Sequence, residues 1–146
     1  MKVQKNLKMK VLFNASVILS GLYSPNGGSA KVLKYVRDKK ITGVISEVVF
    51  DEVLKHADKM NLSKEYLSRS CLEIFGKINN APSQKLTDKY SKLVLDFGDR
   101  HVLASAEEHK VKYLLTLDKK HLLVLNGKIK NLIILKPEDF IRKFKW

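Results

Sequence analysis

Val11-Leu12-Phe13-Asn14-Ala15-Ser16-Val17-Ile18-Leu19-Ser20, near the start of the 146-residue chain, joins a short apolar run to a segment of helical composition. Its leading apolar run is short and is typical of a buried strand, and residues 16–22 follow directly with the composition of a helix. A strand that runs straight into a helix is the opening unit of an α/β fold. Asn14 lies at the junction between the two.

The same alternation of short apolar strands and amphipathic helices continues along the chain. Further helices are expected from Ser29 and Ser46, which can act as N-caps, over about 63–75, from Asp99, and from Pro137. Further strands are expected at 41–45, 113–116 and 132–135, with Leu93-Val94-Leu95 as a candidate short extended segment. This order predicts one α/β domain over residues 1–146, a three-layer α/β/α structure with a mostly parallel central sheet of about four or five strands. Residues 1–9 are expected to form a basic N-terminal extension.

Composition places the chain among ordinary globular proteins, with 45% hydrophobic and 29% charged residues. No apolar run reaches the roughly 18 residues that cross a bilayer, and the lysine-rich start lacks the features of a signal peptide. We therefore expect a cytoplasmic protein with no membrane partner. The single Cys71 cannot form an internal disulfide and is expected to be buried as a small apolar residue.

The net charge of the chain is strongly positive. Twenty-eight Lys and Arg residues against fifteen Asp and Glu leave a formal charge of +13, which attracts polyanions such as nucleic acids. A solvated, lysine-rich surface produces the same count without any such partner, so charge alone does not decide the function.

Polar residues follow the predicted strands at the points where parallel sheets bind their ligands. Asn14 follows the first strand and Asp118 follows the strand at 113–116. Asp99 starts the helix that leads into that strand, and Glu52 lies on the helix after the second strand. If these oxygens converge, they require a hard cation such as Mg²⁺ or Mn²⁺, which can activate water against a phosphodiester.

Each of these residues also has a structural explanation. Asn14 can simply cap the following helix, Asp99 can interact with a helix dipole, and Asp118 can belong to a turn. Glu52 can be a solvated helix residue, and its spacing of four from His56 is usually incidental.

The histidines show no zinc-binding spacing, so roles at the surface or at helix ends are favoured for all four of them and no catalysis is assigned to them: His56, His101, His109 and His121.

The order of these motifs resembles that of the PIN-domain family. The resemblance is to the branch that contains the toxin components of toxin-antitoxin pairs, the VapC-like ribonucleases. The resemblance covers nearly the whole chain. The similar segments, in order, are 11–20, the loop 24–30, Ser46 with Asp51-Glu52, 96–106, Leu115-Thr116-Leu117-Asp118 and 135–140.

The resemblance implies a Mg²⁺- or Mn²⁺-dependent endoribonuclease that acts on RNA, with a cognate antitoxin and a homodimeric state. It assigns the second acid to Glu52, with Asp51 as the alternative, the third to Asp99 and the fourth to Asp118. Thr116 is implied as a helper of these acids.

Two positions depart from the family pattern. Asn14 stands where the family has its first acid, and Ser16 stands where the family has Asn. An amide oxygen can bind a metal but carries no charge, so metal affinity and water activation are expected to weaken. Two alternatives therefore stay open: a non-catalytic PIN-fold module that binds RNA or a protein through its basic surface, and a different doubly wound protein such as a receiver-like domain.

Overall fold

The structure is a computed structural model that describes residues 9–144 of the chain. Its strands are β1 (Lys10–Phe13), β2 (Thr42–Val44), β3 (Tyr113–Leu115) and β4 (Ile133–Leu135). Its α-helices are α1 (Ala15–Tyr23), α2 (Gly28–Arg37), α3 (Glu47–Lys55), α4 (Lys64–Phe75), α5 (Gln84–Asp88), α6 (Phe97–Glu108) and α7 (Pro137–Phe144). Two short 3-10 helices, η2 (Asp58–Met60) and η3 (Leu123–Leu125), complete the described elements.

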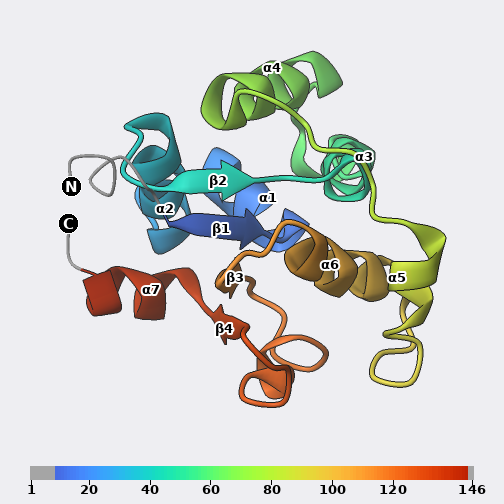
Figure 1. The fold of residues 1–146 in the computed structure, drawn as a ribbon. Helices are drawn as coiled ribbons and strands as arrows, with labels where there is room; N and C mark the ends of the chain where they lie inside the picture. Colours follow the sequence, from blue (N-terminus) through green and yellow to red (C-terminus); the bar gives the residue numbers. More distant parts are fainter. Residues whose placement is uncertain (1–8, 145–146) are drawn as a thin grey trace.

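The four strands form one parallel sheet in the order β2-β1-β3-β4, as Figure 1 shows. Leu12 at the centre of β1 pairs with Val44 on one side and Leu114 on the other. Successive strand residues point to opposite faces, and every residue of 11–13 and 113–115 is buried. Both faces of the sheet are therefore covered, which confirms the predicted three-layer α/β structure.

Local sequence explains where the main helices begin. Asn14 caps α1, because its Oδ1 accepts a hydrogen bond from the Ala15 amide at 2.8 Å. The Ser46 hydroxyl accepts from the Val49 amide and caps α3, while Ser63 caps α4 in the same way. Pro137 is the first residue of α7, where its missing N–H leaves no bond unmade.

Two predictions of where helices begin were wrong. Gly27, not Ser29, precedes α2, and Ser29 is buried inside the first turn of that helix. The helix expected from Asp99 begins at Phe97, because the side chain of Asp96 caps it.

The short extended segment predicted at residues 93–95 was also wrong. These residues form no strand, because the backbone amides of Leu93 and Val94 both donate to the Tyr90 carbonyl in consecutive turns. Leu95 is 92% exposed. A backbone whose donors are already used within a turn does not join a sheet.

Two further sequence predictions concern the N-terminal extension and Cys71. The basic extension at 1–9 falls almost wholly outside the described residues. Cys71 is fully buried, as expected, and burial raises the pKa of its thiol to about 11. Among residues 9–144, no helix combines the length and apolar character needed to cross a membrane.

Candidate metal centre

The predicted site residues follow the carboxyl ends of the two central strands. Asn14 comes directly after β1, and Thr116 comes directly after the neighbouring strand β3. The backbone N–H of Asn14 donates to the Leu115 carbonyl at 3.0 Å, so the two chain segments stay together beyond the last paired residues. In Figure 1 the arrowheads of β1 and β2 point toward the side of the molecule where α3 and α6 lie.

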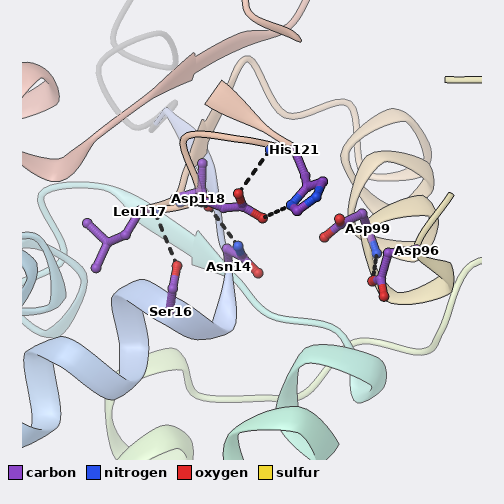
Figure 2. A network of polar contacts seen from close by, with 8 residues as sticks. Asn14, Ser16, Asp96, Asp99, Leu117, Asp118 and His121 are labelled. Atoms are coloured by element: carbon purple, nitrogen blue, oxygen red, sulfur yellow. Dashed lines mark hydrogen bonds and ion pairs between the residues drawn. The ribbon is translucent and has the colours of Figure 1, made fainter. Parts of the chain in front are cut away.

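Thr116 connects Asn14 to Asp118. The Asn14 Nδ2 donates to Thr116 Oγ1 at 2.7 Å, and the same oxygen accepts from the Asp118 amide at 3.1 Å. Thr116 is fully buried and Asn14 is 8% exposed, so both side chains are held in one geometry. Next to them, the Ser16 hydroxyl accepts from the Leu117 amide at 3.1 Å and supports the same turn (Figure 2).

Asp118 also faces His121 and Asp99. Its Oδ1 accepts from the His121 amide at 3.0 Å, and its Oδ2 lies 3.3 Å from His121 Nδ1. One oxygen each of Asp99 and Asp118 and one ring nitrogen of His121 lie within 4.8 Å of one another. Figure 2 shows the three side chains turned toward one another, Asp99 from α6 and the other two from the segment after β3.

Glu52 reaches the same region from α3, which packs against α6. Its carboxylate raises the pKa of Asp99 through charge repulsion, and its Oε1 lies 3.8 Å from where a Cβ of Gly98 would stand. Glu52 is half-buried, whereas the adjacent Asp51 is exposed. Of the two candidates for the second acid, Glu52 is thus the one near the other acids.

Glu52 on α3 and His56 at its C-terminal end lie four residues apart, and the His56 ring bonds to the backbone of that helix. His56 Nδ1 lies 2.8 Å from the backbone carbonyl oxygen of Glu52 and so bonds to its own helix. His56 occupies the C-cap of α3, a helix end as expected.

Asp99 carries the strongest electrostatic signature of the cluster. Partial burial, followed by repulsion from Asp96, Asp118 and Glu52, raises its pKa from 3.8 to about 6, while His121 acts in the opposite direction. Asp96 adds to this repulsion because it caps α6, where its Oδ2 accepts from the Asp99 amide at 3.0 Å. A group of carboxylates that repel one another in this way is stabilised by a bound cation.

The donor set fits a hard divalent cation. The carboxylate oxygens of Asp99, Asp118 and Glu52 are the ligands that Mg²⁺ and Mn²⁺ prefer, and an imidazole nitrogen is compatible with Mn²⁺. Asn14 adds a neutral oxygen, Oδ1, which accepts a hydrogen bond from the Ala15 amide and has a second lone pair available.

Two residues of this cluster were not predicted from the sequence. His121 was expected at the surface without a role, and it lies beside Asp118 and Asp99. Its spacing of three from Asp118 is the only signal in the sequence. Asp96 was not singled out, although an acid three residues before Asp99 is the pattern of an N-cap.

Of the other two histidines, one lies at an expected position and the other is buried. His109 is the C-cap of α6, a helix end as predicted. His101 is buried within α6, against the prediction, and burial lowers its pKa. Its ring packs edge-to-face against Phe97, with the ring centroids 4.5 Å apart.

Comparison with known proteins decides the family. The family model of the PIN domain matches residues 10–120, which include Asn14, Glu52, Asp99, Thr116 and Asp118, whereas His121 lies just beyond the match. The chain belongs to the PIN domain family. This membership excludes the receiver-like alternative. The comparison with curated protein sequences found no match to the chain.

Solved structures share the PIN fold at low sequence identity. VapBC2 from Rickettsia felis, bound to a DNA fragment from its promoter, is 21% identical with a TM-score of 0.61, over 86% of this chain and 97% of that one. A toxin-antitoxin complex from Klebsiella pneumoniae is 24% identical with a TM-score of 0.62, over 87% and 97%. PAE2754 from Pyrobaculum aerophilum is 19% identical with a TM-score of 0.63, over 92% and 88%. The PIN fold of this chain is thus similar to that of toxins in toxin-antitoxin complexes.

Proposed function

We propose that this PIN domain protein is a Mg²⁺- or Mn²⁺-dependent endoribonuclease of the toxin-antitoxin type, with activity reduced by Asn14. The observation that carries the proposal is the approach of Asp99, Asp118 and His121 to within 4.8 Å of one another, beside Asn14 and Glu52. Acids this close are costly to maintain without a cation, and they lie where parallel sheets bind ligands.

In this proposal Glu52, Asp99, Asp118 and Asn14 are the metal ligands. A bound divalent cation would polarise the scissile phosphodiester and lower the pKa of an attacking water. Thr116 positions two of the ligands, since its buried hydroxyl bonds both the Asn14 side chain and the Asp118 amide. Flanking phosphates of the RNA would meet the basic surface that the charge of +13 provides.

Asn14 is the reason for expecting weak activity. Its amide keeps the helix cap of α1 but brings no negative charge to the cluster. The Asn14→Asp variant adds that charge, and the Thr116 hydroxyl can then turn and donate to the new carboxylate instead of accepting from Nδ2. We expect a gain in metal affinity and in cleavage rate from this one change.

The partners follow from the same proposal. The similar structures include one complex described as toxin-antitoxin and two complexes bound to DNA fragments. We propose a cognate antitoxin for this chain on that basis. The homodimeric state and the RNA substrate are proposed from the family resemblance, and the cytoplasmic location is proposed from the sequence.

The test compares three proteins: the chain as given, Asn14→Asp, and the double variant Asn14→Asp with Asp118→Asn. Each is titrated with Mn²⁺ by calorimetry and incubated with fluorescently labelled structured and unstructured RNA. We expect Asn14→Asp to bind Mn²⁺ at least about tenfold more tightly than the given chain and to cleave RNA, and the double variant to lose both gains. If Asn14→Asp binds no metal and cuts no RNA, the proposal is wrong.

The second candidate is a PIN-fold module that binds RNA or a protein partner without catalysis. Asn14 favours it, because the position after β1 carries no charge. For such a module Asn14→Asp restores no cleavage, while RNA affinity still falls steeply with salt.

A further inference from the structure

A second concave surface lies at the opposite end of β3 from the acidic cluster. It has a volume of about 990 Å³, which is at the upper end of the range of ligand pockets. Its walls come from the segment after α5, the second half of α6, the turn between α6 and β3, and the segment from η3 to the start of β4. We call this surface the lysine groove.

The groove is named for the basic residues that line it, which are Lys89, Lys110, Lys112, Lys128 and Lys130. Glu107 is the one acid among the lining residues, and it is already engaged: Lys89 Nζ lies 3.0 Å from both its oxygens, and the Tyr90 hydroxyl donates to it at 2.5 Å. These hydrogen bonds lower the pKa of Glu107. Within residues 9–144, no carboxylate forms an ion pair with the other four lysines.

The rest of the lining is mostly aliphatic. Leu93, 45% exposed, and the half-buried Ile129 and Ile133 present apolar surface, with Leu103, Ala106 and Val111 beneath them. Tyr90 is the aromatic residue of the lining, but it is only 6% exposed and its hydroxyl is bound to Glu107. The described lining thus offers aliphatic contacts and positive charge, but no exposed ring on which a base could stack.

This combination points to one kind of occupant. A nucleic acid would gain phosphate contacts but would leave the aliphatic floor without a partner, since its bases prefer aromatic faces. A second copy of the chain would bring another net charge of +13 against the lysines. An amphipathic helix with acidic residues beside an apolar stripe satisfies both parts of the surface at once.

We propose that the lysine groove is a docking site for an acidic amphipathic helix of a partner protein. The aliphatic residues of that helix would contact Leu93 and Ile129, and its carboxylates would meet the four lysines that form no ion pair within residues 9–144. The site is separate from the acidic cluster and stands independently of the proposed nuclease activity. An interaction here would leave the metal centre accessible.

The test uses a fluorescein-labelled peptide of about 18 residues made of Leu, Glu and Ala, long enough to be helical, with Leu at helical spacing on one face. A scrambled peptide of the same composition is its control. Fluorescence anisotropy measures binding to the full chain and to a groove variant that carries Lys110→Gln, Lys112→Gln, Lys128→Gln and Lys130→Gln. A matched surface variant carries Lys31→Gln, Lys40→Gln, Lys59→Gln and Lys77→Gln, the same change of charge at exposed positions outside the groove.

We expect the amphipathic peptide to bind more tightly than the scrambled one, and the groove variant to lose about tenfold in affinity, with less than about threefold lost in the surface variant. Leu93→Ser, at an exposed position, should weaken binding of the amphipathic peptide and leave binding of the scrambled peptide unchanged. Circular dichroism melts check that each variant is folded.

Equal binding of the two peptides, or equal losses in the groove and surface variants, overturns the proposal. A labelled oligouridine that loses affinity in the groove variant while the peptide does not would overturn it too, and would assign the groove to nucleic acid.

Discussion

Thr116 is the residue that holds the two central strand ends together at the site. Its hydroxyl oxygen accepts from the Asn14 side chain and from the Asp118 amide, and it is fully buried. Thr116→Val keeps the shape of the side chain but leaves both donors without a partner. We expect a loss of about 1–3 kcal/mol in the free energy of unfolding, measured by urea denaturation. Thr116→Ser keeps the hydroxyl and should lose much less, so equal losses in the two variants would refute this role.

Asp99 makes the stability of the metal-free protein depend on pH. Because its pKa is raised to about 6 in the folded state, its contribution to stability is fully present below its ordinary value of 3.8 and is lost as the pH rises through 6. Asp99→Asn removes that dependence. Between about pH 4 and pH 7, the free energy of unfolding of the variant should therefore rise relative to that of the given chain. The gain should reach about 1 kcal/mol after allowance for solvent screening.

Thermal unfolding in EDTA across this pH range measures the difference. Mg²⁺ should close the gap, because a cation stabilises the ionised Asp99 in the given chain and has less to bind in the variant. A gap that stays constant with pH would contradict the electrostatic explanation.

At the scale of elements, the N-terminus of α6 combines a structural and an electrostatic function. Asp96 caps the helix through its Oδ2 and also raises the pKa of Asp99 by repulsion. Asp96→Ser should keep the cap and lower the pKa of Asp99, because a hydroxyl accepts the same hydrogen bond without charge. Asp96→Ala should also remove the repulsion but destabilise the protein by about 1 kcal/mol. An NMR titration of the Asp99 carboxyl, together with thermal melts, separates the two effects; an unchanged pKa in both variants would rule out the repulsion.

The same elements explain what the sequence could predict. β1 and α1 were predictable because a short apolar run followed by a capping residue specifies both. Asn14 and Asp118 were placed by the predicted strands that they follow, whereas Thr116 came only from the family resemblance. Gln84–Asp88 was missed as a helix because five residues carry little periodicity. His121 was missed because its position depends on the turn in which its amide bonds to Asp118 Oδ1. A bond of that kind is set by the folded turn and not by spacing.

At the scale of the whole molecule, a basic protein carries a concentrated acidic site. The excess of 28 basic over 15 acidic residues attracts polyanions, but Glu52, Asp99 and Asp118 repel phosphate locally when no cation is bound. On the proposed function, these two parts of the surface would have opposite effects on RNA binding without metal, and a bound cation would remove the local repulsion. The lysine groove lies at the far end of β3, so charge at that end attracts anions whether or not a metal is present.

This opposition predicts how metal and salt change RNA binding. In EDTA, the double variant Asp99→Asn with Asp118→Asn should bind a labelled oligouridine several-fold more tightly than the given chain, because two repulsive charges are gone. Mn²⁺ should raise the affinity of the given chain and leave the double variant nearly unchanged. For both proteins the affinity should fall as salt rises from about 50 to 200 mM, since phosphate contacts release counterions. Fluorescence anisotropy measures all three effects, and an affinity of the given chain that does not respond to Mn²⁺ would favour a binding module whose RNA surface lies away from these acids.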